Sequence, residues 1–116
     1  MAAKNDRLAL LRDYLDNDTQ QIKEMLELFL ETLPNDLHEL TVFCEKNDTE
    51  NIRKTAHRIK SSVKLFGLNN VGDILQKMEF FNKKKTLPQQ AKTLMKQVNQ
   101  LMNQAFEQLR KELASL

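Results

Sequence analysis

The chain has 116 residues, which suits one domain with a single modest core, and 41% of them are hydrophobic while 29% are charged. Only two glycines and two prolines occur, and no stretch alternates as β-strands do, so an all-α fold is predicted. A formal net charge of +2 and an aromatic content of 6% argue against nucleic-acid binding. No apolar run is long enough to span a membrane and no secretory pattern opens the chain, so we expect a cytoplasmic protein that does not bind membranes.

A short first helix is predicted near the amino terminus. Either Asn5 or Asp6 can cap it, because both side chains accept hydrogen bonds from free backbone N–H groups. Its leucines recur on one side of the helix: Leu8, Leu11 and Leu15. The polar run of residues 16–18 then breaks the pattern, so this helix is expected to be short.

A longer second helix is predicted after Asp18, which suits an N-cap position. Its apolar stripe recurs at helical spacing: Ile22, Met25, Leu26, Phe29, Leu30, Leu33, Leu37, Leu40 and Cys44. Pro34 lacks the N–H that would bond to the carbonyl of Leu30, so a kink or short break is expected there. Cys44 is the only cysteine, which excludes an internal disulfide, favours a reducing compartment and suggests a buried structural thiol.

A third helix is predicted to begin after Asp48, a second good N-cap residue, and to end at Gly67 in a left-handed conformation. Its apolar residues mark the side that faces the core: Ile52, Ala56, Ile59, Val63 and Phe66. This helix carries one of the two histidines of the chain, His57, at the edge of that stripe.

Two further helices complete the pattern. The fourth opens at Asn69 or Asn70 and turns an apolar side inward: Val71, Ile74, Leu75, Met78 and Phe81. Gly72 costs this helix about 1 kcal/mol relative to alanine, which is typical of a close crossing with a neighbour. After the basic stretch 82–85, residues 86–89 resemble a capping box, and the last helix runs from about Leu87 with this stripe: Leu94, Met95, Val98, Leu101, Met102, Ala105, Leu109 and Leu113.

Long helices joined by short turns predict an all-α fold, an up-and-down four-helix bundle with a short N-terminal capping helix. No repeat, linker or change of composition divides the chain, so residues 1–116 are predicted to form a single domain. We expect this domain to be a monomer.

The polar side of the third helix carries the most informative pattern of the sequence. Lys60, Ser61 and Lys64 follow His57 at three, four and seven residues, so the four side chains share one side of the helix. An exposed imidazole is mostly neutral near pH 7 and acts as a nucleophile, while an ammonium one turn away can hold a phosphoryl group. His38 has no such neighbours, and we interpret it as a surface histidine.

Residues 56–67, Ala-His-Arg-Ile-Lys-Ser-Ser-Val-Lys-Leu-Phe-Gly, resemble the signature helix of histidine phosphotransfer (HPt) domains, roughly Ala-His-x-Leu-Lys-Gly-Ser-x-x-x-x-Gly. The resemblance implies that His57 is the phosphoacceptor and that Lys60 stabilises the phosphate. Ser62 matches the small residue and Gly67 the closing glycine, both with structural roles. Ser61 replaces the family's glycine, and we expect its extra bulk to restrict which partners dock or how fast they react.

The resemblance further implies a phosphocarrier of bacterial two-component phosphorelays, which takes a phosphoryl group from one receiver-domain aspartate and passes it to another. Its expected partners are response-regulator receiver domains or a hybrid histidine kinase. Because the receiver supplies both the aspartate and Mg²⁺, this chain is expected to need no cofactor and no metal ligands. Four residues around the histidine are predicted to contact the partner, in a positive surface opposed mainly by Glu50: Ser61, Lys64, Arg58 and Lys54.

Other functions remain to be weighed against the carrier. Kinase activity is excluded for this chain, because two glycines cannot build the glycine-rich lid of a nucleotide-binding domain, although the chain could be a piece of a hybrid histidine kinase. The main alternative is a helical interaction or dimerisation module without phosphotransfer. In that case His57 is incidental, and the apolar stripe of the last helix, which continues to Leu113, pairs with a partner.

Overall fold

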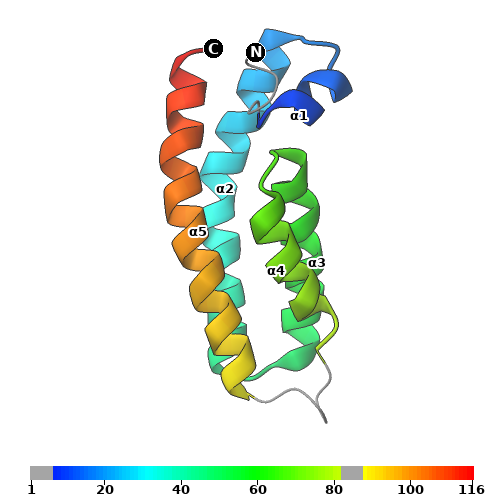
Figure 1. Cartoon of the computed structure of the whole chain (residues 1–116), viewed down its shortest axis with the longest axis vertical. Helices are drawn as coiled ribbons and strands as arrows, with labels where there is room; N and C mark the ends of the chain where they lie inside the picture. Colours follow the sequence, from blue (N-terminus) through cyan, green and yellow to red (C-terminus); the bar gives the residue numbers. More distant parts are fainter. Residues whose placement is uncertain (1–6, 82–87) are drawn as a thin grey trace.

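The computed structural model describes residues 7–81 and 88–116, and within these ranges it is all-α (Figure 1). A short α1 precedes a bundle of four helices with these bounds: α1 Ala9–Tyr14, α2 Thr19–Glu45, α3 Thr49–Leu65, α4 Asn69–Glu79 and α5 Pro88–Ala114. Helix α2 packs on α3 and α5, and α4 packs on α3 and α5, so the four helices close around one core. This confirms the predicted fold class.

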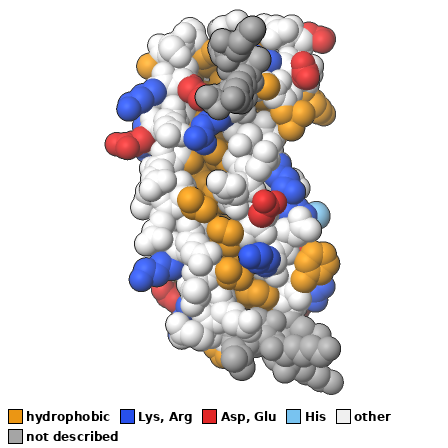
Figure 2. Space-filling model, in the orientation of Figure 1, with side chains coloured by type: hydrophobic (Ala, Val, Ile, Leu, Met, Phe, Trp, Pro, Cys, Tyr) orange, Lys and Arg blue, Asp and Glu red, His pale blue; other side chains and the backbone are white. Residues whose placement is uncertain are grey.

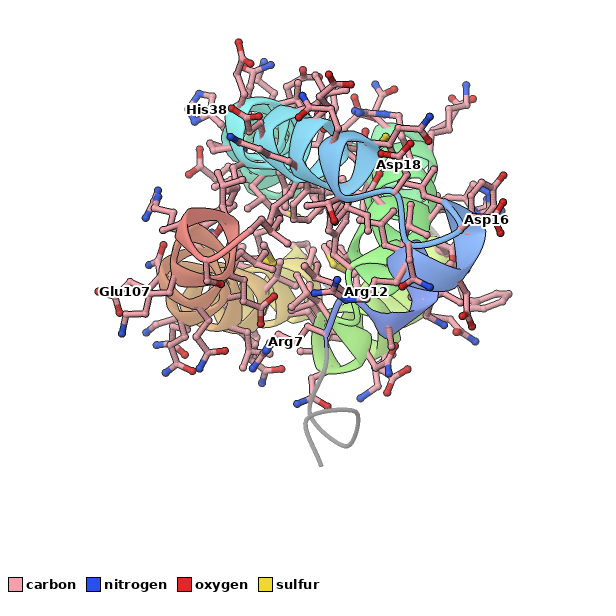
Figure 3. The ribbon with its side chains drawn as sticks, turned by 90° about the horizontal axis from the view of Figure 1, so that it is seen from above. Arg7, Arg12, Asp16, Asp18, His38 and Glu107 are labelled. Carbon is pink, nitrogen blue, oxygen red and sulfur yellow. The ribbon has the colours of Figure 1, made fainter. Side chains whose placement is uncertain are left out.

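The long helices α2 and α5 run side by side along the molecule, which measures 46 × 21 × 20 Å, while α3 and α4 form a shorter hairpin beside them (Figure 1). Seen from above, α1 lies across the end of that hairpin (Figure 3). Leu8 and Leu11 are 1% and 0% exposed, so this end of the core is covered by the start of the chain. The capping role predicted for the first helix is therefore correct.

Two aspartates begin the helices as the sequence predicts. The side chain of Asp18 accepts a hydrogen bond from the backbone N–H of Gln21 at 3.1 Å, and Asp48 accepts one from Asn51 at 3.3 Å. Each satisfies a backbone donor that the first turn of a helix leaves free. Asn5, Asp6, Thr86 and Leu87, which were predicted to cap or begin helices, lie outside the described residues.

Helix α2 continues through Pro34 without the short break considered above. A proline inside a helix removes one backbone hydrogen bond, but Leu33 and Leu37 on either side of it are 1% and 6% exposed. Packing of these leucines maintains the helix. Met25 differs from its prediction, because 36% of it is exposed although it lies near the apolar stripe of α2.

The predicted stripe of α3 is buried throughout, with no member more than 2% exposed. At its end, the ring of Phe66 stacks on Phe29 of α2 with 4.0 Å between the ring centroids. Cys44 is buried as predicted, and burial together with the charge of Glu45 raises the pKa of its thiol to about 12. The thiol is therefore protonated and unreactive at neutral pH.

The turn between α3 and α4 fixes how these two helices face each other. Gly67 has a φ of +72°, its N–H donates to the Lys64 carbonyl at 3.1 Å, and the N–H of Leu68 donates to the Val63 carbonyl at 2.9 Å. These two bonds form a Schellman motif, which ends α3 as predicted. Because Leu68 directly follows this motif, α4 begins at Asn69 without a side-chain cap.

Candidate functional site

His57 lies in the middle of α3 with 68% of its side chain exposed. Its Nδ1 is hydrogen-bonded to Oε1 of Glu79, which ends α4. The other ring nitrogen, Nε2, makes no hydrogen bond within the described part of the chain. The ring is therefore held by one edge and open at the other.

Glu79 joins His57 to Lys60. The second carboxylate oxygen of Glu79, Oε2, lies 2.5 Å from Nζ of Lys60. The side chains of Glu79 and Lys60 are only 12% and 20% exposed, so both are more buried than the histidine. We call these three residues the His57–Glu79–Lys60 cluster. Arg53, one turn before His57, donates from Nε to the backbone carbonyl of Glu79 at 3.1 Å and so stabilises the end of α4.

The charge of Glu79 determines how the cluster works. Burial alone raises the pKa of Glu79, but hydrogen bonds and charges from Lys60 and His57 more than offset it, so the pKa lies below its ordinary value of 4.5. Glu79 is thus a carboxylate near neutral pH and can only accept hydrogen bonds. Nδ1 of a neutral His57 ring must therefore carry the proton, which leaves the lone pair on Nε2.

The residues predicted to contact the partner differ in the contacts that they make within the chain. Ser61 is exposed, and its hydroxyl donates to the carbonyl of His57 at 3.3 Å. Arg58 is paired with Asp36 of α2 at 2.9 Å. Lys54 is paired with Glu50 at 3.3 Å; both are more than 70% exposed, and such pairs contribute little stability. The prediction that mainly Glu50 opposes these cations was wrong for Arg58, which pairs instead with Asp36 of the neighbouring helix α2.

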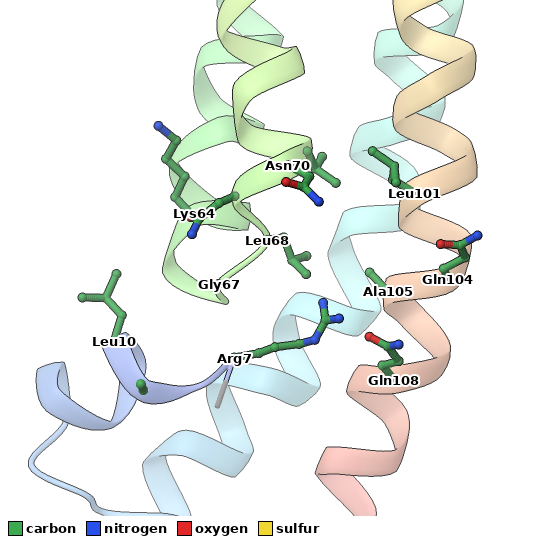
Figure 4. A pocket seen from close by; sticks show the side chains of 13 residues that line it. Arg7, Leu10, Lys64, Gly67, Leu68, Asn70, Leu101, Gln104, Ala105 and Gln108 are labelled. Carbon is green, nitrogen blue, oxygen red and sulfur yellow. The ribbon is translucent and has the colours of Figure 1, made fainter. Parts of the chain in front are cut away.

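Lys64 lies apart from the cluster. It packs over Gly72 and lines a cavity of about 640 Å³ between the start of the chain, the α3–α4 turn and α5 (Figure 4). Arg7, Asn70 and Gln108 also line this cavity. The two predicted structural residues, Ser62 and Gly67, are both partly exposed. On the α3 side of the molecule, Figure 2 shows a histidine at the surface next to basic side chains.

Sequence reasoning missed Glu79, although the hairpin contained a signal for it. Lys64 and Gly72 meet across the hairpin at three residues before and five residues after Gly67. His57 and Glu79 are ten residues before and twelve residues after it, which is the same offset of two. In an antiparallel pair of helices a constant offset places such residues opposite each other. Once the contact at Gly72 was expected, the register could have been extended to Glu79.

His38 shows what distinguishes the site from an ordinary surface histidine. It points outward from α2 and lies away from the α3–α4 hairpin (Figure 3). No group of three His, Cys, Asp or Glu side chains suited to a metal ion occurs among residues 7–81 and 88–116. Within the same ranges, no helix is both long enough and apolar enough to cross a bilayer.

The fold and site together define a class of protein. His57 is 68% exposed and does not line the cavities of about 640, 420 and 530 Å³, so its ring stands at the open surface of α3. An exposed imidazole with one open ring nitrogen can act as a nucleophile toward a group carried by another protein.

The comparison with protein families agrees. A model of the Hpt domain family matches residues 24–116, so the chain belongs to the Hpt family. Hpt domains are phosphocarriers of phosphorelays rather than catalytic enzymes, and the family implies receiver-domain partners. Searches of curated proteins and of solved structures each gave no match.

Proposed function

We propose that His57 accepts a phosphoryl group from a receiver-domain aspartate and passes it to the aspartate of another receiver. The observation that carries this proposal is the state of the ring: Nδ1 is hydrogen-bonded to Glu79, while Nε2 is open on an exposed surface. Transfer needs the attacking nitrogen, the phosphorus and the leaving oxygen roughly in line. A convex helical surface leaves that line of approach free.

Lys60 is the proposed phosphate-stabilising residue. Its Nζ lies beside Glu79, one turn along α3 from the histidine, and its flexible stem lets the ammonium turn toward phosphate oxygens on Nε2. Before phosphorylation, Lys60 balances the charge of Glu79. After phosphorylation, it can balance both anions, which stabilises charge in the phosphorylated and transferring states.

The proposed docking surface surrounds His57 on the exposed side of α3. Ser61 lies one turn beyond the histidine, where its hydroxymethyl group meets the approaching partner and limits how closely that partner fits. Arg58 and Lys54 lie near it and favour encounter with an acidic receiver pocket. Lys64 lies at the edge of this surface, toward the α3–α4 turn. The receiver is expected to bring the aspartate and Mg²⁺.

The experiment is phosphotransfer from phosphorylated receiver domains with Mg²⁺, followed by acid and base treatment of the labelled chain. We expect an acid-labile, base-stable label that is lost in His57→Ala, while His38→Ala keeps it as the matched control. Circular dichroism checks that both variants retain their helices. Full labelling of His57→Ala would contradict the proposal.

The alternative of a dimerisation module requires an apolar surface at the end of the last helix that a partner chain would bury. Leu109 is 0% exposed, and Leu113 and Leu116 pack against the core of the same chain. The apolar stripe at this end of α5 is thus used within the chain, so it gives no support to dimerisation.

A further inference from the structure

Glu79 is placed to act after His57 has been phosphorylated as well as before. Building on the proposed function, we propose that the Glu79 carboxylate is a positioning group that keeps the proton on Nδ1 of phosphorylated His57. The ring then leaves as neutral imidazole when the phosphoryl group is passed on. This assigns Glu79 a role in the outgoing half of the exchange.

The geometry allows the same hydrogen bond in both states. Glu79 contacts the Nδ1 edge of the ring, and phosphorylation takes place at Nε2 on the opposite edge. Both carboxylate oxygens are held, because His57 binds Oε1 and Lys60 binds Oε2, while Arg53 binds the backbone carbonyl of the same residue. Its 12% exposure leaves little room for it to swing away. A phosphoryl group can therefore be added without displacing Glu79.

Glu79 is the anion that faces the ring. On α3, the neighbouring cations are Lys60, which is bound to Glu79, and Arg53, which is bound to its carbonyl. Toward α2, Arg58 is paired with Asp36, and that pair lies on the other flank of α3. Lys77, in the last turn of α4, is exposed. The carboxylate therefore meets the Nδ1–H directly, while Lys60, Arg53 and Arg58 are bound as described.

The chemistry of the outgoing step requires this proton. The acceptor is a carboxylate of the receiver, whose oxygen attacks phosphorus, so an O–P bond forms as the P–Nε2 bond breaks. The bonding electron pair returns to Nε2. If Nδ1 is protonated, the departing ring is neutral and no proton has to move. If Nδ1 has lost its proton, the ring must leave as imidazolate, a far poorer leaving group. An adjacent carboxylate stabilises the positive charge of the protonated, phosphorylated ring.

The test follows the Nδ1 proton directly and uses the whole chain. Protein labelled with ¹⁵N is phosphorylated with phosphoramidate, and the ring nitrogens of phosphorylated His57 are followed by NMR as a function of pH. The rate of hydrolysis of the phosphorylated protein is measured over the same range. Glu79→Gln removes the charge with little change in shape. Glu50→Gln is the matched control, because it removes one negative charge from an exposed position on α3, the helix that carries His57.

We expect the native chain to keep the Nδ1 proton to a pH about one unit higher than Glu79→Gln, with the same shift in the pH profile of hydrolysis. Glu50→Gln should behave like the native chain. Equal midpoints in the native chain and Glu79→Gln would overturn this inference while leaving phosphorylation of His57 intact. A native chain that phosphoramidate does not phosphorylate on His57 would instead contradict the proposed function. Circular dichroism confirms in each case that the variant is folded.

Discussion

The side chain of Lys64 lies across the backbone of Gly72 where α3 and α4 cross. A Cβ atom added at position 72 would be 2.9 Å from both Cγ and Cε of Lys64, so one of the two side chains would have to move. The glycine permits the close approach of the two helices, and this approach sets the register that brings Glu79 to His57.

The first prediction concerns this crossing. Alanine favours a helix over glycine by about 1 kcal/mol, but Gly72→Ala must also displace Lys64. We expect Gly72→Ala alone to change the free energy of unfolding only slightly. In a Lys64→Ala background, the same change should stabilise the domain by about 1 kcal/mol, because nothing has to move. Denaturant unfolding of the four proteins measures this coupling, and equal effects in both backgrounds would contradict the crossing described here.

A second prediction concerns Gly67. Its nearest neighbour is the backbone of Arg7, which cannot move aside as the flexible side chain of Lys64 can beside Gly72. A Cβ atom at position 67 would lie 2.5 Å from the carbonyl oxygen of Arg7, and the φ of +72° disfavours any other residue. We expect Gly67→Ala to lower the free energy of unfolding by about 2 kcal/mol or more, since the left-handed conformation alone costs about 1–2 kcal/mol. Denaturant unfolding checks this, with Ser62→Ala in the last turns of α3 as a mild comparison.

Glu79 should make stability depend on pH. Its pKa is lowered in the folded chain, so its stabilising effect is fully present above the ordinary value of 4.5 and is lost as pH falls through the folded pKa. Native protein should therefore exceed Glu79→Gln in stability at pH 7, and the difference should shrink below about pH 4.5. Unfolding by urea at several pH values measures the difference. A constant difference across this range would mean that the ion pair with Lys60 does not carry the effect.

Lys60→Ala should affect both transfer and stability. Lys60 is only 20% exposed and its partner Glu79 is 12% exposed, so removing the ammonium leaves a largely buried carboxylate without its paired cation. We expect a loss of about 1–3 kcal/mol in the free energy of unfolding and slower phosphorylation of His57. Lys54→Ala, which alters an exposed pair, should leave stability within about 0.5 kcal/mol of the native chain. Rates of transfer that are unchanged in Lys60→Ala would remove its proposed role.

Much of the fold could be predicted because it depends on local patterns. Apolar spacing indicated the helices, Asp18 and Asp48 indicated two of their starts, and Gly67 indicated the end of α3. These signals lie within a few residues of the feature that they specify. The continuous course of α2 through Pro34 was harder to predict, because it depends on packing of the flanking leucines against other helices.

The candidate site was predictable only in part for the same reason. His57, Lys60 and Ser61 share one helix, so their proximity follows from helical spacing. Glu79 and Asp36 reach α3 from other helices, and their arrival depends on the register of helix pairs. A sequence pattern along α3 contains no trace of either residue.

The contact between Arg7 and Gly67 has a practical consequence for anyone who trims the protein. The family match begins at residue 24, but the segment that covers the α3–α4 turn lies before that residue. In this segment Arg7 contacts Gly67, and Leu8 and Leu11 are buried in the core. A version that began at residue 24 would lack α1 and would expose the apolar surface beneath it to solvent. Such a fragment should be less stable and more prone to aggregation, even though it contains the whole of the histidine helix.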